Sequence, residues 1–350
     1  MLVASVGIRV RPFKLGVQLA HFLKRTNTTQ VWRNGSHEDL DKSITCLREA
    51  LSAERYPWPS LPRHRALTNL ASNLVERSQQ RGSNADLDEA MRSYEEALES
   101  CPADDPDRAV SLHNFAYALS LRLYLHGSQD DLNNAIAFRQ KALGSNSLPQ
   151  LVHQHSLGYL ADDLIIRFKQ QGSDADLDQA LKYYREALAL CPPPHPDRDM
   201  SLHNLADALA LYFVEKDSPT GFDQVIALYR EALSLRPRLH PHRHISLTGL
   251  SLALVLRFEL QRRQDFLPDL DEAIAFHREA LQLCPSSHPD RSSSLYHLAE
   301  TLRIRYEATG RSRHDLEEAV DLLREAVKLE KREAYAGSLQ KCVELLDSAA

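Results

Sequence analysis

A motif that returns every 45 to 48 residues constrains the fold of this chain more than any other feature of its sequence. Its clearest form is D-L-D-E-A, and its apolar second position occurs once in each of seven repeats: Leu40, Leu87, Leu132, Leu177, Phe222, Leu270 and Leu316. An alanine ten residues later keeps the same spacing: Ala50, Ala97, Ala142, Ala187, Ala232, Ala280 and Ala326. Two landmarks that stay in step predict an array of repeated units.

Each repeat is predicted to contain two helices, because its apolar residues recur at three- and four-residue spacing. In the first helix, such as residues 197–215, this spacing places the apolar side chains on one face: Leu202, Leu205, Ala206, Leu209 and Phe213. Several first helices end at a glycine suited to a left-handed C-cap: Gly82, Gly127, Gly172 and Gly310. The second helix opens with capping-box spacing, as in Asp86 and Glu89, with the aspartate expected as the cap.

The second helix resembles that of a tetratricopeptide (TPR) repeat. The segment D-L-D-E-A-M-R-S-Y-E-E-A-L-E-S-C-P has the residues typical of the family's second helix: Ala90, Tyr94, Ala97 and Pro102. Leu70 and Ala71 match the leucine and the small residue of the first helix. A standard repeat has about 34 residues, so both helices are longer here. The resemblance extends over about residues 35–329 and implies an all-α fold, a right-handed α-solenoid of TPR-like helix-turn-helix repeats.

Three segments are expected along the chain. Residues 1–35 form an atypical basic N-terminal segment with a degraded half-repeat, residues 36–330 form an array of about seven repeats, and residues 331–350 form a C-terminal capping helix. Terminal repeats are atypical because they pack on one neighbour only. The basic, acid-free N-terminus leaves three interpretations open: a mitochondrial targeting segment, a half-repeat, or an error in the gene model.

Composition indicates a folded protein of a reducing compartment. Apolar residues make up 43% of the chain and charged residues 26%, which is typical of soluble domains. Five cysteines, no apolar run of membrane-spanning length and no evident secretory signal favour the cytoplasm, with mitochondria as the alternative. The net charge of −6 and the lack of aromatic residues among the basic ones predict neither a nucleic-acid nor a membrane partner.

One stretch, H-P-D-R-D-M-S-L-H-N-L-A-D-A-L at residues 195–209, contains groups that suggest catalysis. On a helix, however, Ser201 and His203 point about 200° apart, so they cannot pair as nucleophile and base. The serine also recurs at the same position of other repeats: Ser111, Ser156, Ser246 and Ser294. No phosphate-binding loop, H-E-x-x-H or nucleophile elbow is present. We therefore predict a non-enzymatic protein without a catalytic residue, cofactor or metal.

Other polar residues recur with the repeat and are interpreted structurally. Arginines that open the first helices are expected to form salt bridges between helices: Arg63, Arg108, Arg198, Arg243 and Arg291. Three cysteines before a helix-ending proline are expected to be packing residues, because spacings such as C-x-x-C are missing: Cys101, Cys191 and Cys284. The H-P-H-R-H segment is expected to be a solvated loop, although its neighbouring histidines could bind zinc: His240, His242 and His244.

What remains for function is recognition by the first helices. The TPR resemblance implies that they line a concave groove, into which the residues three before and one after the Ala71-type position project. These positions vary between repeats, and the candidate partner-binding residues are His113, Tyr117, Asp162, His203, Asp207, Tyr296 and Glu300. We predict a protein-protein interaction scaffold that binds a peptide or partner protein of unknown identity. Imidazole, phenol and carboxylate groups favour a basic or polar peptide.

Two other functions remain open. The long form of the repeat, ending in H-P-D-R, also resembles fungal TPR arrays often associated with CHAT domains, which are caspase-like peptidase modules. The chain would then be a regulatory or truncated part of a CHAT-type peptidase system, with the catalytic module elsewhere. The second of these alternatives is a metal-dependent hydrolase that uses the histidine clusters.

Overall fold

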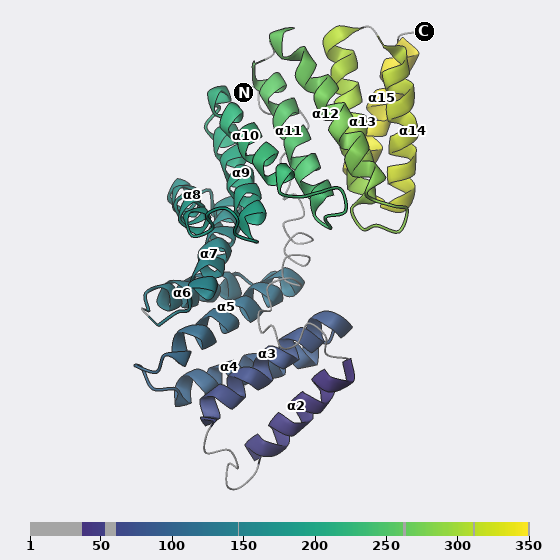
Figure 1. Cartoon of the computed structure of the whole chain (residues 1–350). Coiled ribbons are helices and arrows are strands. Elements are labelled where there is room, and N and C mark those ends of the chain that lie inside the picture. Colours follow the sequence, from purple (N-terminus) through teal and green to yellow (C-terminus); the bar gives the residue numbers. More distant parts are fainter. Residues whose placement is uncertain (1–36, 53–60, 146, 262–263, 311, 349–350) are drawn as a thin grey trace. The chain divides into compact units, whose positions relative to one another are not determined.

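The computed structural model describes residues 37–52, 61–145, 147–261, 264–310 and 312–348. The predicted N-terminal segment, residues 1–35, lies outside these residues. The described residues form helices joined by short turns, with no strand among them (Figure 1). The predicted fold class, an all-α solenoid of TPR-like helix-turn-helix repeats, is confirmed.

The chain divides between residues 187 and 188 into two compact parts, and each is described by itself. In the first part, α3 pairs with α4 and α5 with α6, and α2, α4 and α6 also pack on the first helix that follows each of them (Figure 1). Its helices are α2 (His37–Ser52), α3 (Arg63–Arg81), α4 (Asn84–Ser100), α5 (Asp107–His126), α6 (Gln129–Leu143), α7 (Gln150–Gln171) and α8 (Asp174–Ala189).

In the second part, α9 pairs with α10, α11 with α12 and α13 with α14, while α15 packs on α14 and α13. Its helices are α9 (Arg198–Glu215), η1 (Pro219–Gly221), α10 (Phe222–Ser234), α11 (Arg243–Gln261), η2 (Gln264–Phe266), α12 (Leu267–Gln282), α13 (Arg291–Thr309), α14 (Arg313–Leu329) and α15 (Glu333–Ser348). The helix α15 lies within the segment predicted as the C-terminal capping helix.

The repeated landmarks form the core of both parts. The alanines and all but the first of the D-L-D-E-A landmarks are buried, and second helices such as α4, α6, α10 and α12 pack on their own first helix and on the next one. Leu40, on α2, is only partly buried. Small side chains such as Ala97 and Ala280 let neighbouring helices approach closely. The sequence repeat is therefore a repeat of packing positions.

Helix ends follow the sequence at the C-terminus of the first helices and differ from it at the N-terminus of the second. The predicted glycines have positive φ, as at Gly82 (69°) and Gly310 (62°), and their N–H groups donate to the carbonyl four residues earlier. The capping-box prediction is wrong about the cap. Ser83 is the N-cap, and its hydroxyl accepts the Asp86 N–H at 3.2 Å, so the aspartate lies one turn inside the helix.

The displaced aspartate forms an ion pair with the first helix. Both carboxylate oxygens of Asp86 accept hydrogen bonds from Arg77, at 2.7 and 2.6 Å. The same bidentate pair recurs in four other repeats: Arg122 with Asp131, Arg167 with Asp176, Arg257 with Asp269 and Arg305 with Asp315. A planar guanidinium bound to both oxygens fixes the angle between the two helices as well as their distance.

Asp86→Asn is expected to lower the free energy of unfolding by about 1–2 kcal/mol at neutral pH, because it removes a charge-assisted pair. The hydrogen bond from Arg77 holds the pKa of Asp86 below its ordinary value. The stabilisation by the Asp86–Arg77 pair is therefore present above the pKa of Asp86 in the unfolded chain, about 4, and is lost as pH falls through its lower pKa in the folded protein. Denaturant unfolding followed by circular dichroism should show the difference from wild type shrinking in acid. Asp88→Asn, on the exposed face of the same helix, is the control; a difference that stays constant as pH is lowered contradicts this account.

Among the repeats whose two helices are both described, one lacks this ion pair. At the equivalent positions of α9 and α10, Tyr212 and Gly221 replace the arginine and the aspartate. A Cβ atom on Gly221 would lie 2.1 Å from the Phe213 ring, so that ring fills the space of the missing carboxylate. An aromatic contact therefore replaces the ion pair in this repeat, where Phe213 also packs on Phe222.

Candidate functional site

The seven predicted partner-binding residues lie on the first helices α5, α7, α9 and α13. Tyr117, Asp162 and His203 are buried. The prediction that the side chains of these three project into an open groove is therefore wrong. The other four candidates are partly exposed: His113, Asp207, Tyr296 and Glu300. Each of them also contacts other residues of the repeat array, and these contacts limit what its side chain can bind.

The position after the small residue contacts a tyrosine of the second helix. Tyr184 of α8 donates its hydroxyl hydrogen to Asp162, and Tyr229 of α10 donates to Asp207. In α3 and α4, the equivalent hydroxyl groups of Ser72 and Tyr94 are 3.0 Å apart. Where Tyr117 occupies this position, its hydroxyl accepts a hydrogen bond from Gln79 Nε2 at 2.8 Å. Variation at this position therefore matches a neighbouring helix: the second helix of the same repeat at Ser72, Asp162 and Asp207, and the preceding first helix, α3, at Tyr117.

The position three before the small residue lies between consecutive first helices. His113 Nδ1 is 2.6 Å from Ser156 Oγ of α7, as the Thr68 hydroxyl is 2.9 Å from Ser111 Oγ in the preceding repeat. Burial, aided by Arg139, lowers the pKa of His113 to about 3. The His113 imidazole is therefore neutral at physiological pH and braces two helices.

His203 and Asp207 lie one helical turn apart, with His203 Nε2 3.5 Å from Asp207 Oδ2. The His203 ring packs edge-on against Tyr229 at 5.4 Å between centroids. Burial lowers the pKa of His203 to about 4, although Asp207 opposes the shift. The Ser201 hydroxyl donates to the Asp197 carbonyl at 3.2 Å. The stretch that suggested catalysis is therefore the start of a packed helix. Of the pair His203 and Asp207, only Asp207 is partly exposed, with 40% of its side chain accessible.

Tyr296 and Glu300 are also engaged. Tyr296 stacks on Tyr335 of α15 with centroids 4.9 Å apart. Glu300 accepts hydrogen bonds from Arg303 on the next turn, at 2.9 and 3.3 Å. The tyrosine stack joins α13 to α15, whereas the Glu300–Arg303 pair lies within α13.

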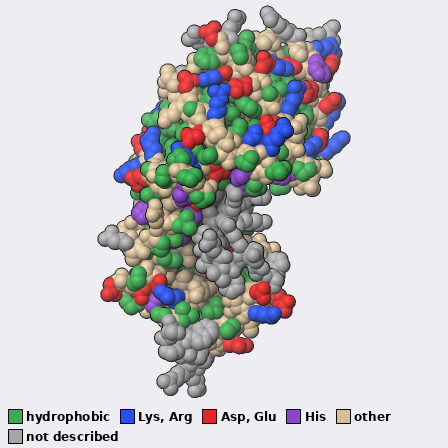
Figure 2. Space-filling view, viewed as in Figure 1, with side chains coloured by type: hydrophobic (Ala, Val, Ile, Leu, Met, Phe, Trp, Pro, Cys, Tyr) green, Lys and Arg blue, Asp and Glu red, His purple; other side chains and the backbone are tan. Residues whose placement is uncertain are grey.

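An apolar strip on the second part was missed by the sequence prediction. It consists of partly exposed residues of two first helices: Leu211 and Val214 on α9, and Leu252, Leu256 and Leu260 on α11. The two helices contact each other directly. The available signal was a second three- and four-residue spacing, offset from the core positions by one or two residues. Figure 2 shows how apolar side chains of the second part reach the surface between charged ones.

The predicted salt bridges between helices are present for four of the five arginines that open the first helices, Arg63, Arg198, Arg243 and Arg291, whereas Arg108 donates to the carbonyls of Leu98 and Cys101. Arg198 donates to the Cys191 carbonyl at 2.9 Å and to Glu231 of α10 at 2.6 Å. Arg291 binds the Cys284 carbonyl and Glu325 in the same way, both at 2.8 Å. Each arginine thus caps the preceding second helix and braces the following one, and its guanidinium is occupied.

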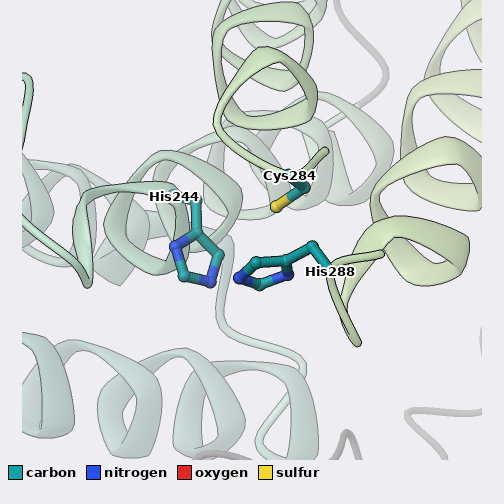
Figure 3. Close-up of side chains that lie close together, drawn as sticks. All are labelled: His244, Cys284 and His288. Atoms are coloured by element: carbon teal, nitrogen blue, oxygen red, sulfur yellow. The ribbon is translucent and has the colours of Figure 1, made fainter. Parts of the chain in front are cut away.

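Histidines and cysteines lie together at one recurring place, the turn from a second helix to the next first helix. The prediction of a solvated H-P-H-R-H loop is wrong for His242 and His244, which are buried. Among the described residues, two clusters have ligand atoms within 4.8 Å of one another: His244 with Cys284 and His288 (Figure 3), and His64 with Cys101 and Asp105. Of the three cysteines predicted as packing residues, two are therefore beside metal-binding side chains.

None of the helices in the described part of the chain combines the length and the apolar character needed to cross a membrane.

The paired helices, the recurring core and the exposed first-helix faces define a helical-repeat protein of the solenoid class. Residues 65–107 match the family model described as tetratricopeptide repeat. No curated protein sequence matches the chain. Together with the repeat structure, the match makes this chain a TPR-like protein. None of these findings tests the association with CHAT domains, which stays a prediction.

Several solved structures share the fold. The C-terminal part of a TPR repeat-containing protein from Cytophaga hutchinsonii is 14% identical, with a TM-score of 0.51, over 92% of this chain and 98% of that one. Acl4, an assembly chaperone of RpL4, is 14% identical with a TM-score of 0.50, over 79% and 97%. A human IFIT1 dimer with m7Gppp-AAAA is 15% identical with a TM-score of 0.51, over 89% and 62%. At these identities the likeness shows the fold alone.

Proposed function

We propose that the chain is a protein-interaction scaffold that binds a peptide or a segment of a partner protein along the first helices of its second part. The observation that carries this proposal is the apolar strip. Its five side chains are partly exposed, whereas the core leucines of the same helices, such as Leu209 and Leu254, are buried. Apolar side chains that face water next to one another are typical of interaction surfaces.

The charge beside the strip indicates the chemistry of the partner. Asp207 lies one helical turn before Leu211 and is the partly exposed carboxylate of α9. Glu215 and Glu259 lie near the other ends of α9 and α11. A partner segment that combines apolar side chains with lysine or arginine would bury the strip and place its cations beside these carboxylates.

The fold alone does not choose between ligands, since one solved relative is a chaperone of a protein and another is bound to m7Gppp-AAAA. Charge supports a protein ligand. The chain has a net charge of −6, whereas a nucleic-acid surface needs clustered cations. The start-of-helix arginines are already bound to glutamates and carbonyls.

Selection of peptides from a random displayed library on the full chain tests this proposal. We expect enriched peptides that combine apolar residues with lysine or arginine and that bind more weakly as salt is raised. The double variant Leu211→Glu/Leu256→Glu should bind them at least about tenfold more weakly, a loss of about 1.4 kcal/mol. Leu239→Glu, in the exposed turn between α10 and α11, is the matched control. Equal binding by wild type and the double variant, or no enrichment, would falsify the proposal.

A further inference from the structure

We propose that His244, Cys284 and His288 form a structural zinc site, with Asp290 as the fourth ligand. The site joins three segments of the second part: the start of α11, the end of α12 and the turn that leads to α13 (Figure 3). Zinc in proteins is held by four ligands from cysteine, histidine and aspartate or glutamate, and this set provides all three types. The proposal is independent of peptide binding by the apolar strip.

The positions of the side chains carry the inference. The ligand atoms of His244, Cys284 and His288 lie within 4.8 Å of one another, and the two rings are 4.8 Å apart at a steep angle. Ligand atoms of one tetrahedral zinc ion are about 3.3–3.8 Å apart, given bonds of about 2.0–2.3 Å. Movements of about an ångström, within the reach of side-chain torsions, bring the set to this geometry.

Asp290 completes the set. It is the N-cap residue of α13, a position where a carboxylate ordinarily caps its own helix, yet it makes no side-chain cap bond. Its Oδ2 lies instead 3.4 Å from His244 Nε2 and 4.0 Å from His288 Nδ1. The carboxylate therefore already points to the two imidazoles.

The preceding repeat shows what this place in the fold holds. There Arg236 stands at the position of Cys284, Asp199 at that of His244 and His240 at that of His288. The buried guanidinium of Arg236 donates to Asp199 at 2.7 Å and to Ser246 at 2.8 Å. One repeat thus places a buried cation in this turn, and the next has a thiol in its place, keeps the imidazole at the His240 position and replaces the aspartate by a second imidazole. A zinc ion bound by a thiolate would supply the corresponding positive charge.

The ligand types favour zinc over the hard cations. Thiolate and imidazole suit zinc, whereas magnesium and calcium prefer oxygen ligands. The Cys284 side chain is fully buried, while those of His288 and Asp290 are about a fifth exposed and give the ion a way in from solvent. Four protein ligands leave no open position, which indicates a structural role. Bound zinc would tie the turn at residues 284–290 to α11.

Zinc binding to the full-length, reduced protein, measured by calorimetric titration of the chelator-treated chain, tests the proposal. We expect Cys284→Ser to lose one equivalent of zinc, or to bind it more than about 100-fold more weakly. Cys191→Ser is the matched control, since Cys191 holds the equivalent position and contacts Ser201 at 3.4 Å; it should bind zinc as wild type does. Cobalt in place of zinc should give thiolate-to-metal absorption that the Cys284→Ser variant lacks.

His288→Asn guards against a folding defect, because His288 lies in a turn and is partly exposed. It should keep the wild-type circular dichroism spectrum and still lose the same zinc equivalent. Zinc should also raise the unfolding temperature of wild type and not that of either variant. The same zinc stoichiometry and affinity in wild type, Cys284→Ser and His288→Asn would overturn the proposal, as would cobalt spectra without a thiolate band.

Discussion

Asp163→Ala is expected to lower the free energy of unfolding of the first part by about 3–5 kcal/mol. Asp163 of α7 forms a buried ion pair with Arg139 of α6, and the two residues are 2% and 1% exposed. Ser120 of α5 links them, since it donates to Asp163 at 3.2 Å and accepts from Arg139 at 3.0 Å. Without the carboxylate, the guanidinium stays buried without its charge partner, and desolvation is then uncompensated.

Other repeats of the chain supply the matched control. Single repeats have an apolar residue at one of the two positions: Leu323 stands in place of the arginine in one repeat, and Ala208 stands in place of the aspartate in another. The double variant Arg139→Leu/Asp163→Ala should therefore recover most of the loss, because no buried charge remains. Denaturant unfolding followed by circular dichroism measures the difference, and hydrogen exchange assigns it to α5, α6 and α7. If Asp163→Ala is as stable as the double variant, the ion pair does not contribute as described.

The periodic part of the structure could be predicted from the sequence because packing repeats with the chain. Leu87 and Ala97 recur because second helices such as α4, α6, α10 and α12 contact the same two kinds of neighbour, and Gly82 recurs because the left-handed C-cap needs a glycine. Such positions show their role by their spacing alone. The error at Asp86 has a local cause: an aspartate at a plausible cap position and a serine three residues earlier are equally good caps. The structure shows which of the two is the cap: both carboxylate oxygens of Asp86 bind Arg77, and the Ser83 hydroxyl caps the helix.

The candidate site was harder to predict, because variation between repeats has two causes. A residue that changes from repeat to repeat can serve a ligand or match a changed neighbour. Asp162 and Asp207 belong to the second kind, since each accepts a hydrogen bond from a tyrosine 22 residues later in the chain. Burial, which separates the two causes, depends on the neighbouring helices and not on the spacing within one helix. The partly exposed leucines on α11 were not predicted either, because their exposure also depends on the neighbouring helices.

The zinc ligands show another limit of prediction from spacing. Cys284 and His288 are four residues apart, but His244 lies forty residues earlier in the chain, at the start of α11. Motifs such as C-x-x-C register only ligands that are close in sequence. In a repeat array, residues one repeat apart become neighbours, so a comparison of equivalent positions, Arg236 with Cys284 and Asp199 with His244, is the signal that could have found the cluster.

The same comparison leads to a second large effect, at the buried arginine of the preceding repeat. Asp199→Ala should lower the free energy of unfolding of the second part by about 3–5 kcal/mol. It leaves the guanidinium of Arg236, which is 0% exposed, without its carboxylate partner. Denaturant unfolding measures this loss, and Asp197→Ala, at the N-cap of α9 without a side-chain cap bond, is the control on the same turn.

The double variant Asp199→His/Arg236→Cys turns this ion pair into a copy of the proposed zinc ligands, because His240 already stands at the position of His288. We expect it to bind one more equivalent of zinc than wild type, with His242, at the position of Asp290, as the fourth ligand. Zinc at about 100 times its dissociation constant should then raise the free energy of unfolding by about 2.7 kcal/mol. The single variant Arg236→Cys keeps Asp199 and should gain less. A double variant that unfolds at the same denaturant concentration with and without zinc would show that the turn does not provide the ligand geometry inferred for His244, Cys284 and His288.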